Sequence, residues 1–247
     1  MTETNNMLPD WIIRQATLGS NVIVEDGLTD ENRFWFLLTV CCPLIFEQYA
    51  IILHPFWLDI EAEKLITSEL ISKSDELENK NLQRINWTNF FRRFNYDFKL
   101  ESAYKTQEII RQQLLTNGEE PTKWPDYIGF PNEGNCETEE LKMVFSRLKE
   151  LYGDIEVNFY YCPLKTHKWD EEKILKGKLS ELDKLIERND LRGNPTAIFP
   201  DDKSWCLITD YDLPFTYIGG KKELIDNLTG KKEFDIYEIE PCFKEKA

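Results

Sequence analysis

The chain has 247 residues, of which 41% are hydrophobic, 13% aromatic and 30% charged, so it carries enough apolar side chains to build a folded core. Its 30 basic and 45 acidic side chains give a formal net charge of −15. This balance argues against a protein that binds nucleic acid, because such a protein presents a basic surface to the phosphates. The plain interpretation of the acidity is solubility, and the sharper one is complementarity to a basic protein partner.

Neither an export signal nor a membrane span is expected. The apolar segment 11–13 is shorter than the run of about 7–15 residues that a secretory signal uses. The longest apolar stretch, 34–58, is interrupted by Glu47 and His54, whereas a spanning helix has about 20 mostly apolar residues. We therefore expect a cytoplasmic protein without membrane contact, in which the six cysteines stay reduced.

Patterning in the first half of the chain predicts short strands followed by helices. Apolar runs bounded by turn residues indicate strands, and apolar side chains spaced three and four apart indicate helices. Asp59 is well placed to cap a helix, because its side chain can accept from the free N–H groups of the first turn. The expected elements are strands at 21–25, 34–46 and 49–53, a helix at 60–71, a short aromatic core helix within 85–98, a helix at 102–117, and loops at 72–81 and 118–135.

The second half gives the clearest helix and a series of short strands. The apolar side chains of 138–152 recur with helical spacing, and a glycine follows where a helix ends. Further elements are expected as strands at 155–161, 197–199, 204–209, 215–218 and 234–239, and as helices at 179–189 and 221–229. Together they predict an α+β fold with a mostly antiparallel sheet and helices packed around it. We expect residues 1–247 to form a single domain, with a softer division near 118–135.

Metal binding has little support in the spacing of candidate ligands. Cys162 and His167 form a closely spaced pair, but no second pair at zinc-like spacing accompanies it. A surface histidine near a core thiol is the simpler interpretation. His54 lies in an apolar run and predicts a core histidine with its hydrogen bonds satisfied. No metal and no cofactor is expected.

Aspartates gather between residues 201 and 212. The strand expected between them separates Asp201 and Asp202 from Asp210 and Asp212 by about 26 Å, so the two pairs cannot share an ion. Asp210 and Asp212 alone can point the same way. They predict either a turn that their own carboxylates stabilise or the carboxylate pair of a hydrolase or transferase assisted by His167.

Glycines and a lysine stand where a strand is expected to lead into a helix. The N–H groups of Gly219, Gly220 and Lys221, together with the positive end of the helix dipole, would suit an anion. The alternative is that the glycines only provide the freedom of the backbone turn.

Aromatic side chains in loops suggest an interaction surface. Five such side chains lie in or beside predicted loops and turns: Trp124, Tyr127, Trp169, Tyr211 and Tyr217. Such side chains are favoured in protein interfaces because they bury a large area and keep a polar atom. The alternative is that they pin these loops onto the core.

The sequence favours a non-catalytic, cytoplasmic protein-binding module of the immunity or inhibitor kind, whose acidic and aromatic surface docks a basic protein. This similarity is one of composition, not of a matched motif. The predicted contact residues are Trp124, Tyr127, Trp169, Asp210, Tyr211 and Asp212. The alternative is a hydrolase or transferase that uses Asp210 and Asp212 near the Gly219–Gly220 turn.

Overall fold

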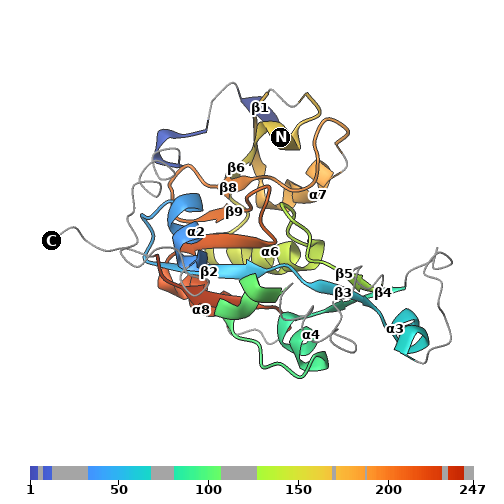
Figure 1. Cartoon of the computed structure of the whole chain (residues 1–247). Helices are drawn as coiled ribbons and strands as arrows, with labels where there is room; N and C mark the ends of the chain where they lie inside the picture. The colour runs from blue at the N-terminus through green and yellow to red at the C-terminus, as the bar shows by residue number, and fades with distance from the viewer. Residues whose placement is uncertain are drawn as a thin grey trace. The chain divides into compact units, whose positions relative to one another are not determined.

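Two sheets organise the chain, which is drawn in Figure 1. The structure is a computed structural model, and it describes residues 1–4, 8–12, 33–67, 81–106, 127–168, 171–186, 188–229 and 233–241. It has two compact units, one formed by Met1–His54 and Asn132–Ala247 and the other by Pro55–Pro131. The second boundary falls inside the expected softer division at 118–135. Whether the units make one domain stays a prediction.

The larger unit contains an eight-stranded sheet in the order β1-β7-β6-β8-β9-β10-β2-β11. Its strands are β1 (Thr2–Thr4), β2 (Gln48–Leu53), β6 (Glu156–Tyr161), β7 (Lys173–Lys178), β8 (Ala197–Phe199), β9 (Cys206–Ile208), β10 (Phe215–Gly220) and β11 (Ile236–Ile239). Its helices are α2 (Arg33–Cys41), α6 (Thr138–Tyr152), α7 (Leu182–Ile186) and α8 (Lys222–Thr229), with the 3₁₀ turns η3 (Pro163–Lys165) and η4 (Leu179–Glu181). Every pair of neighbouring strands is antiparallel, which confirms the predicted α+β fold.

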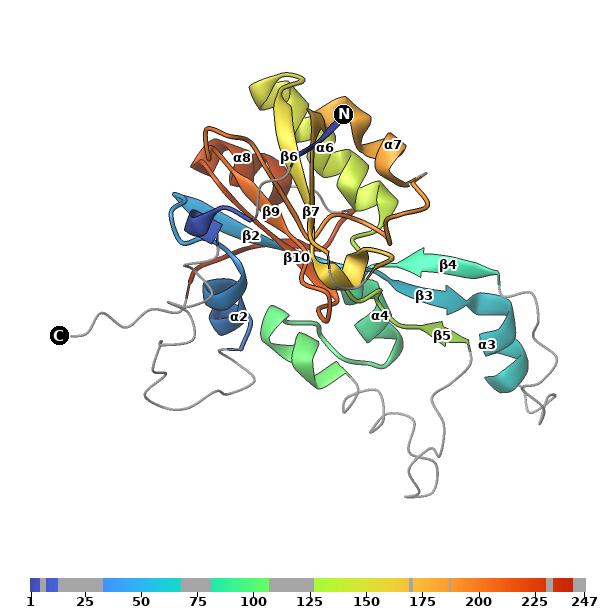
Figure 2. The same cartoon turned by 90° about the horizontal axis from the view of Figure 1, so that it is seen from above.

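Helices cover both faces of this sheet. Helices α6, α7 and α8 lie on one face and α2 on the other, as Figure 2 shows. Strand β6 shows why both faces of the sheet are packed against other parts of the chain, since its apolar side chains alternate between the two faces. Phe159 packs into the core beneath α6, with Val144 and Leu148 of that helix, whereas Tyr160 belongs to a second core with Ile12.

The smaller unit is built around aromatic side chains. It contains β3 (Phe56–Asp59), α3 (Ile60–Thr67), β4 (Leu82–Ile85), α4 (Trp87–Arg93), the 3₁₀ helix η2 (Leu100–Lys105) and β5 (Ile128–Gly129), with β3 as the central strand of three. The rings of Phe56 and Phe90 stack at 3.7 Å between centroids, which ties α4 to β3. Asp59 caps α3 as predicted, because its Oδ1 accepts from the N–H groups of Glu61 and Ala62 at 3.1 and 3.0 Å.

Several sequence predictions of elements fail in the two units. The strand expected at 34–46 is wrong, because Arg33–Cys41 forms helix α2. A short apolar run fits a buried helix as well as a buried strand, and its periodicity does not separate the two. Five strands were not predicted, namely β1, β3, β4, β5 and β7, and the expected strand at 21–25 lies outside the described residues.

The described helices include none that combines the length and the apolar character needed to cross a bilayer. Cys41, Cys42, Cys136, Cys162 and Cys206 are all free thiols.

Candidate functional site

The predicted carboxylate pair lies in the turn between β9 and β10. Oδ1 of Asp210 accepts from the backbone N–H of Asp212 at 3.1 Å, so the side chain of Asp210 stabilises its own turn. Asp212 and Tyr211 are exposed, and Tyr211 has a fractional exposure of 39%. This arrangement agrees with the turn interpretation of the pair. The hydrolase or transferase alternative stays a prediction.

The other two aspartates lie beyond the opposite end of β9, as the spacing predicted. Asp201 accepts from Nδ2 of Asn158 at 2.8 Å and from Nζ of Lys176 at 2.5 Å. These donors hold the pKa of the Asp201 carboxyl below its usual value, with the Lys176 hydrogen bond as the main cause. Throughout the described ranges, no three His, Cys, Asp or Glu side chains come together to hold a metal ion.

The glycines of the predicted anion site belong to a strand instead. Gly219 and Gly220 are the last residues of β10 and are buried, so the expected glycine turn into the helix is wrong. A Cβ at Gly219 would lie 2.3 Å from Cδ2 of Phe46, which explains the need for glycine there. At the start of α8, the backbone N–H of Lys222 donates to Oε2 of Glu47 at 3.1 Å. The protein's own carboxylate therefore already lies at this helix terminus.

The predicted aromatic contact residues have different surroundings. Trp124 and Trp169 lie outside the described residues. Tyr127 is buried, and its carbonyl accepts from the N–H of Asp59 at 2.9 Å, so it pins its loop to β3. Of the other two described residues, Tyr211 is exposed, whereas Tyr217 is buried within β10 and does not lie in a loop.

The two histidines also differ in exposure. His167 is exposed, and Cys162 is half-buried. His54 is buried, with Nδ1 hydrogen-bonded to the carbonyl of Asn132 and Nε2 lying 2.9 Å from Oγ1 of Thr216. These two bonds suit a neutral ring, in which Nδ1 donates and Nε2 accepts. The prediction of a satisfied core histidine is confirmed.

Lys165 is a buried charge that the sequence did not reveal. Its fractional exposure is 1%, although it belongs to a polar run that looks solvent-facing in the sequence. Its Nζ donates to the carbonyl of Asn194 at 2.9 Å and to that of Gly134, so it joins two loops. Burial lowers its pKa from 10.5 to about 8.

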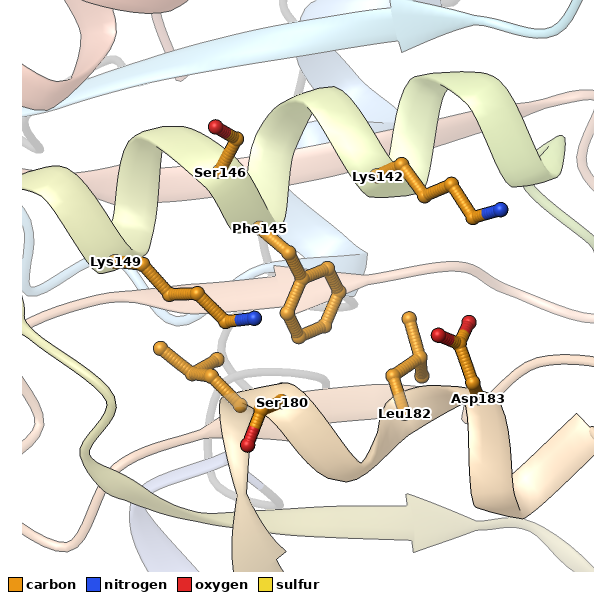
Figure 3. A pocket seen from close by; sticks show the side chains of 8 residues that line it. Lys142, Phe145, Ser146, Lys149, Ser180, Leu182 and Asp183 are labelled. Atoms are coloured by element: carbon orange, nitrogen blue, oxygen red, sulfur yellow. The ribbon is translucent and has the colours of Figure 1, made fainter.

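A hollow of about 190 Å³ lies between α6 and the η4–α7 segment, as Figure 3 shows. The ring of Phe145 points into it. Lys149 reaches across from α6, and Lys142 extends toward Asp183. Because the wall carries a carboxylate as well as the two lysines, it does not present unopposed positive charge to an anion.

A larger groove, of about 390 Å³, lies where β2 begins and β11 ends. We name it the acidic groove. It is lined by Leu44, Phe46, Glu47, Gln48, Tyr49, Glu238, Ile239, Glu240 and Pro241. The carboxylates of Glu47, Glu238 and Glu240 are exposed. The nearby cation of Lys222 is engaged by Oδ1 of Asp226 at 3.0 Å, so the groove keeps an excess of negative charge.

The wall of the acidic groove is held by a tyrosine hydroxyl. Tyr49 is buried, and its hydroxyl accepts from the N–H of Phe46 at 3.0 Å and donates to the carbonyl of Pro43 at 3.2 Å. The rings of Phe46 and Tyr49 meet edge to face at 6.0 Å, and Trp11 contacts Phe46 from outside at 6.5 Å. The groove thus has an ordered aromatic wall beside its carboxylates.

The sequence did not identify the acidic groove, because its two halves are almost 200 residues apart in the chain. Only the pairing of β2 with β11, with Tyr49 opposite Ile239, brings them together. The available signal was an acidic residue near each strand end, which is too common to indicate a site.

A scan against models of protein families found no match to this chain, and neither did searches of curated protein sequences and of solved structures.

Proposed function

We propose that this protein is a non-catalytic binding module that docks a basic protein partner in the acidic groove. The observation that carries the proposal is the cluster of three exposed carboxylates, from Glu47, Glu238 and Glu240, beside the ordered aromatic wall. Charge complementarity steers association and selects the partner, and aromatic side chains supply contact area. The net charge of −15 strengthens attraction to a basic surface at long range.

The groove suits binding better than the Asp210–Asp212 turn suits catalysis. In the turn, Oδ1 of Asp210 accepts from the backbone N–H of Asp212, so this carboxylate is engaged by the turn that it stabilises. In the groove, by contrast, the carboxylates line an open space of about 390 Å³. Glu47 accepts from the backbone N–H of Lys222, so the exposed carboxylates of Glu238 and Glu240 are the groups that a partner meets first.

Affinity capture with the full chain as bait tests the proposal. We expect a basic protein from the native host to be retained near 0.1 M salt and released as salt rises, because screening weakens exposed charge pairs. A groove variant carrying Glu47→Gln, Glu238→Gln and Glu240→Gln should fail to retain it. Glutamine at 47 keeps an oxygen for the N–H of Lys222.

The matched control removes the same amount of charge elsewhere. It carries Glu139→Gln, Glu150→Gln and Asp183→Asn on exposed positions of α6 and α7, and should retain the partner. Equal retention by both variants, or release that does not respond to salt, would overturn the proposed function.

A further inference from the structure

Strand β11 forms one edge of the eight-stranded sheet. It pairs with β2 on one side, and no described strand pairs with it on the other. An edge strand presents a row of main-chain donors and acceptors to which another chain can add.

The register shows which groups face outward. The N–H of Leu53 donates to the carbonyl of Asp235 at 2.9 Å, so residues 53 and 235 form a hydrogen-bonded pair. Such pairs alternate along an antiparallel ladder, so the N–H and C=O groups of Tyr237 point toward β2 and those of Glu238 point away from it. The N–H of Ile236 also faces outward, but it already donates to the carbonyl of Phe234 at 3.1 Å. Glu238 is therefore the central docking position of the edge.

The side chains at this edge define the pattern of an added strand. In an antiparallel added strand, the residue directly opposite Glu238 would share its face of the sheet and would bring its own N–H and C=O toward β11. A lysine there meets the carboxylate of Glu238, with those of Glu47 and Glu240 also lining the acidic groove. The alternate residues of the added strand would share the face of Ile239, which pairs with Tyr49 of β2 and is buried, so apolar side chains suit them.

We propose that β11 receives an extended segment of the basic partner, alternating lysine with apolar residues, as an antiparallel ninth strand that continues the all-antiparallel sheet. This inference rests on the proposed function and adds its binding mode. The same carboxylates argue against a second copy of this chain as the occupant, because two acidic edges repel each other when they pair directly.

Backbone-modified peptides test the proposal on the full chain. The probe is a peptide of alternating lysine and valine, about six residues long so that it spans β11. One analogue carries N-methyl groups on its lysines and the other carries them on its valines, so charge and side chains are the same in both. The lysine N–H groups face β11 in the proposed pairing, so N-methyl-lysine should weaken binding about tenfold and N-methyl-valine should leave it unchanged.

A protein variant tests the same edge from the other side. Glu238→Pro removes an N–H that points away from β2, so the sheet keeps its own ladder. It should bind the unmodified peptide more weakly than Glu238→Gln does, because both variants lose the carboxylate and only Glu238→Pro also loses the N–H. Glu238→Gln is the matched control, which loses the charge and keeps the N–H, and circular dichroism confirms that both variants fold.

The outcomes separate the two levels of the account. Salt-sensitive binding that is equal for both analogues would overturn the added strand and leave the proposed function standing. Absence of salt-sensitive binding for every peptide and for a captured partner would overturn both. If a chain ending at Pro241 binds the peptide and the full chain does not, residues 242–247 compete with the peptide for β11. This outcome would overturn the proposal that a partner segment occupies the edge.

Discussion

His54 and Lys165 are buried bases in the larger unit, and their surroundings favour different protonation states. Burial lowers the pKa of His54 from 6.5 to about 4, and the charge of Lys165 acts in the same direction. Lys165 has two carbonyl oxygens as acceptors for its protons, whereas the hydrogen bonds of His54 suit a neutral ring. The native state therefore keeps His54 neutral at neutral pH and carries the burial cost of a charged Lys165.

We expect His54 to make the protein sensitive to acid. Between pH 6.5 and pH 4 the unfolded chain binds a proton at this residue that the native state does not, so the free energy of unfolding falls as the pH falls. The loss amounts to about 3 kcal/mol at most. Urea unfolding of the wild type and of His54→Gln at several pH values measures it. The wild type should lose more stability than the variant over this range, and parallel curves would contradict the prediction.

Lys165 should make the stability depend on pH in alkaline solution, where His54 has no effect. Its pKa is about 8 in the native state and 10.5 ordinarily, so the unfolded chain binds more protons between these values and the contribution of Lys165 to stability rises with pH. Relative to Lys165→Met, the wild type should gain about 3 kcal/mol at most between pH 8 and pH 10.5. The difference between the two proteins must be followed, because cysteine thiols lose protons in this range in the unfolded chain. Burial raises the pKa of Cys136 and Cys206 in the native state, so this titration lowers the stability of both proteins as the pH rises. A constant difference would refute the prediction.

At the scale of elements, the loops that Lys165 joins also depend on glycine. Gly134 has a φ of +71°, and its N–H donates to the carbonyl of Leu213 at 3.0 Å. A Cβ at this position would lie 2.6 Å from the carbonyl oxygen of Tyr211, a backbone atom that cannot turn aside. Gly153, at the end of α6, has a similar φ of +77° but nothing within 4 Å of its Cβ position.

This pair of glycines gives a matched comparison. Gly153→Ala should cost roughly 1–3 kcal/mol for the backbone alone, because a φ of 77° with a ψ of −175° lies in a region that essentially only glycine adopts. Gly134→Ala should cost roughly 1–3 kcal/mol more, because the surrounding turn must shift as well. Chemical denaturation of both variants measures the two costs. Equal costs would show that the contact with Tyr211 relaxes freely.

Local patterning predicted the elements whose information lies within a few residues. Helix α6 was predicted with its observed bounds, and the caps by Asp59 and Gly153 are features of single positions. Helix α2 was mistaken for a strand because its apolar run has no polar face to set a period. Strand β7, with the sequence KILKGK, was missed because lysines interrupt its apolar alternation.

The candidate site was much less predictable than the fold. The sequence marked turns and glycines near β9 and β10, which are local features, and the structure uses them within the fold itself. The acidic groove depends on the pairing of β2 with β11, and the burial of Lys165 depends on loops around residues 134 and 194. Such long-range contacts leave no periodic trace in the sequence.

At the scale of the whole molecule, the charge of −15 and the acidic groove act over different distances. The net charge attracts a basic partner before the two proteins touch, and salt screens this attraction with a Debye length of about 10 Å at 0.1 M. The carboxylates of the groove act at contact, where they fix orientation as well as attraction. Removing three charges anywhere should therefore slow association modestly, whereas removing them in the groove should also speed dissociation.

The most direct measurement is the dissociation constant of the captured partner for three proteins: the wild type, the groove variant at Glu47, Glu238 and Glu240, and the control variant at Glu139, Glu150 and Asp183. Because the two variants have the same net charge, any difference between them belongs to the groove. We predict that the groove variant binds at least about tenfold more weakly than the control, mainly through faster dissociation. Equal affinities for the two variants would contradict the account, because the partner would then respond to overall charge and not to this site.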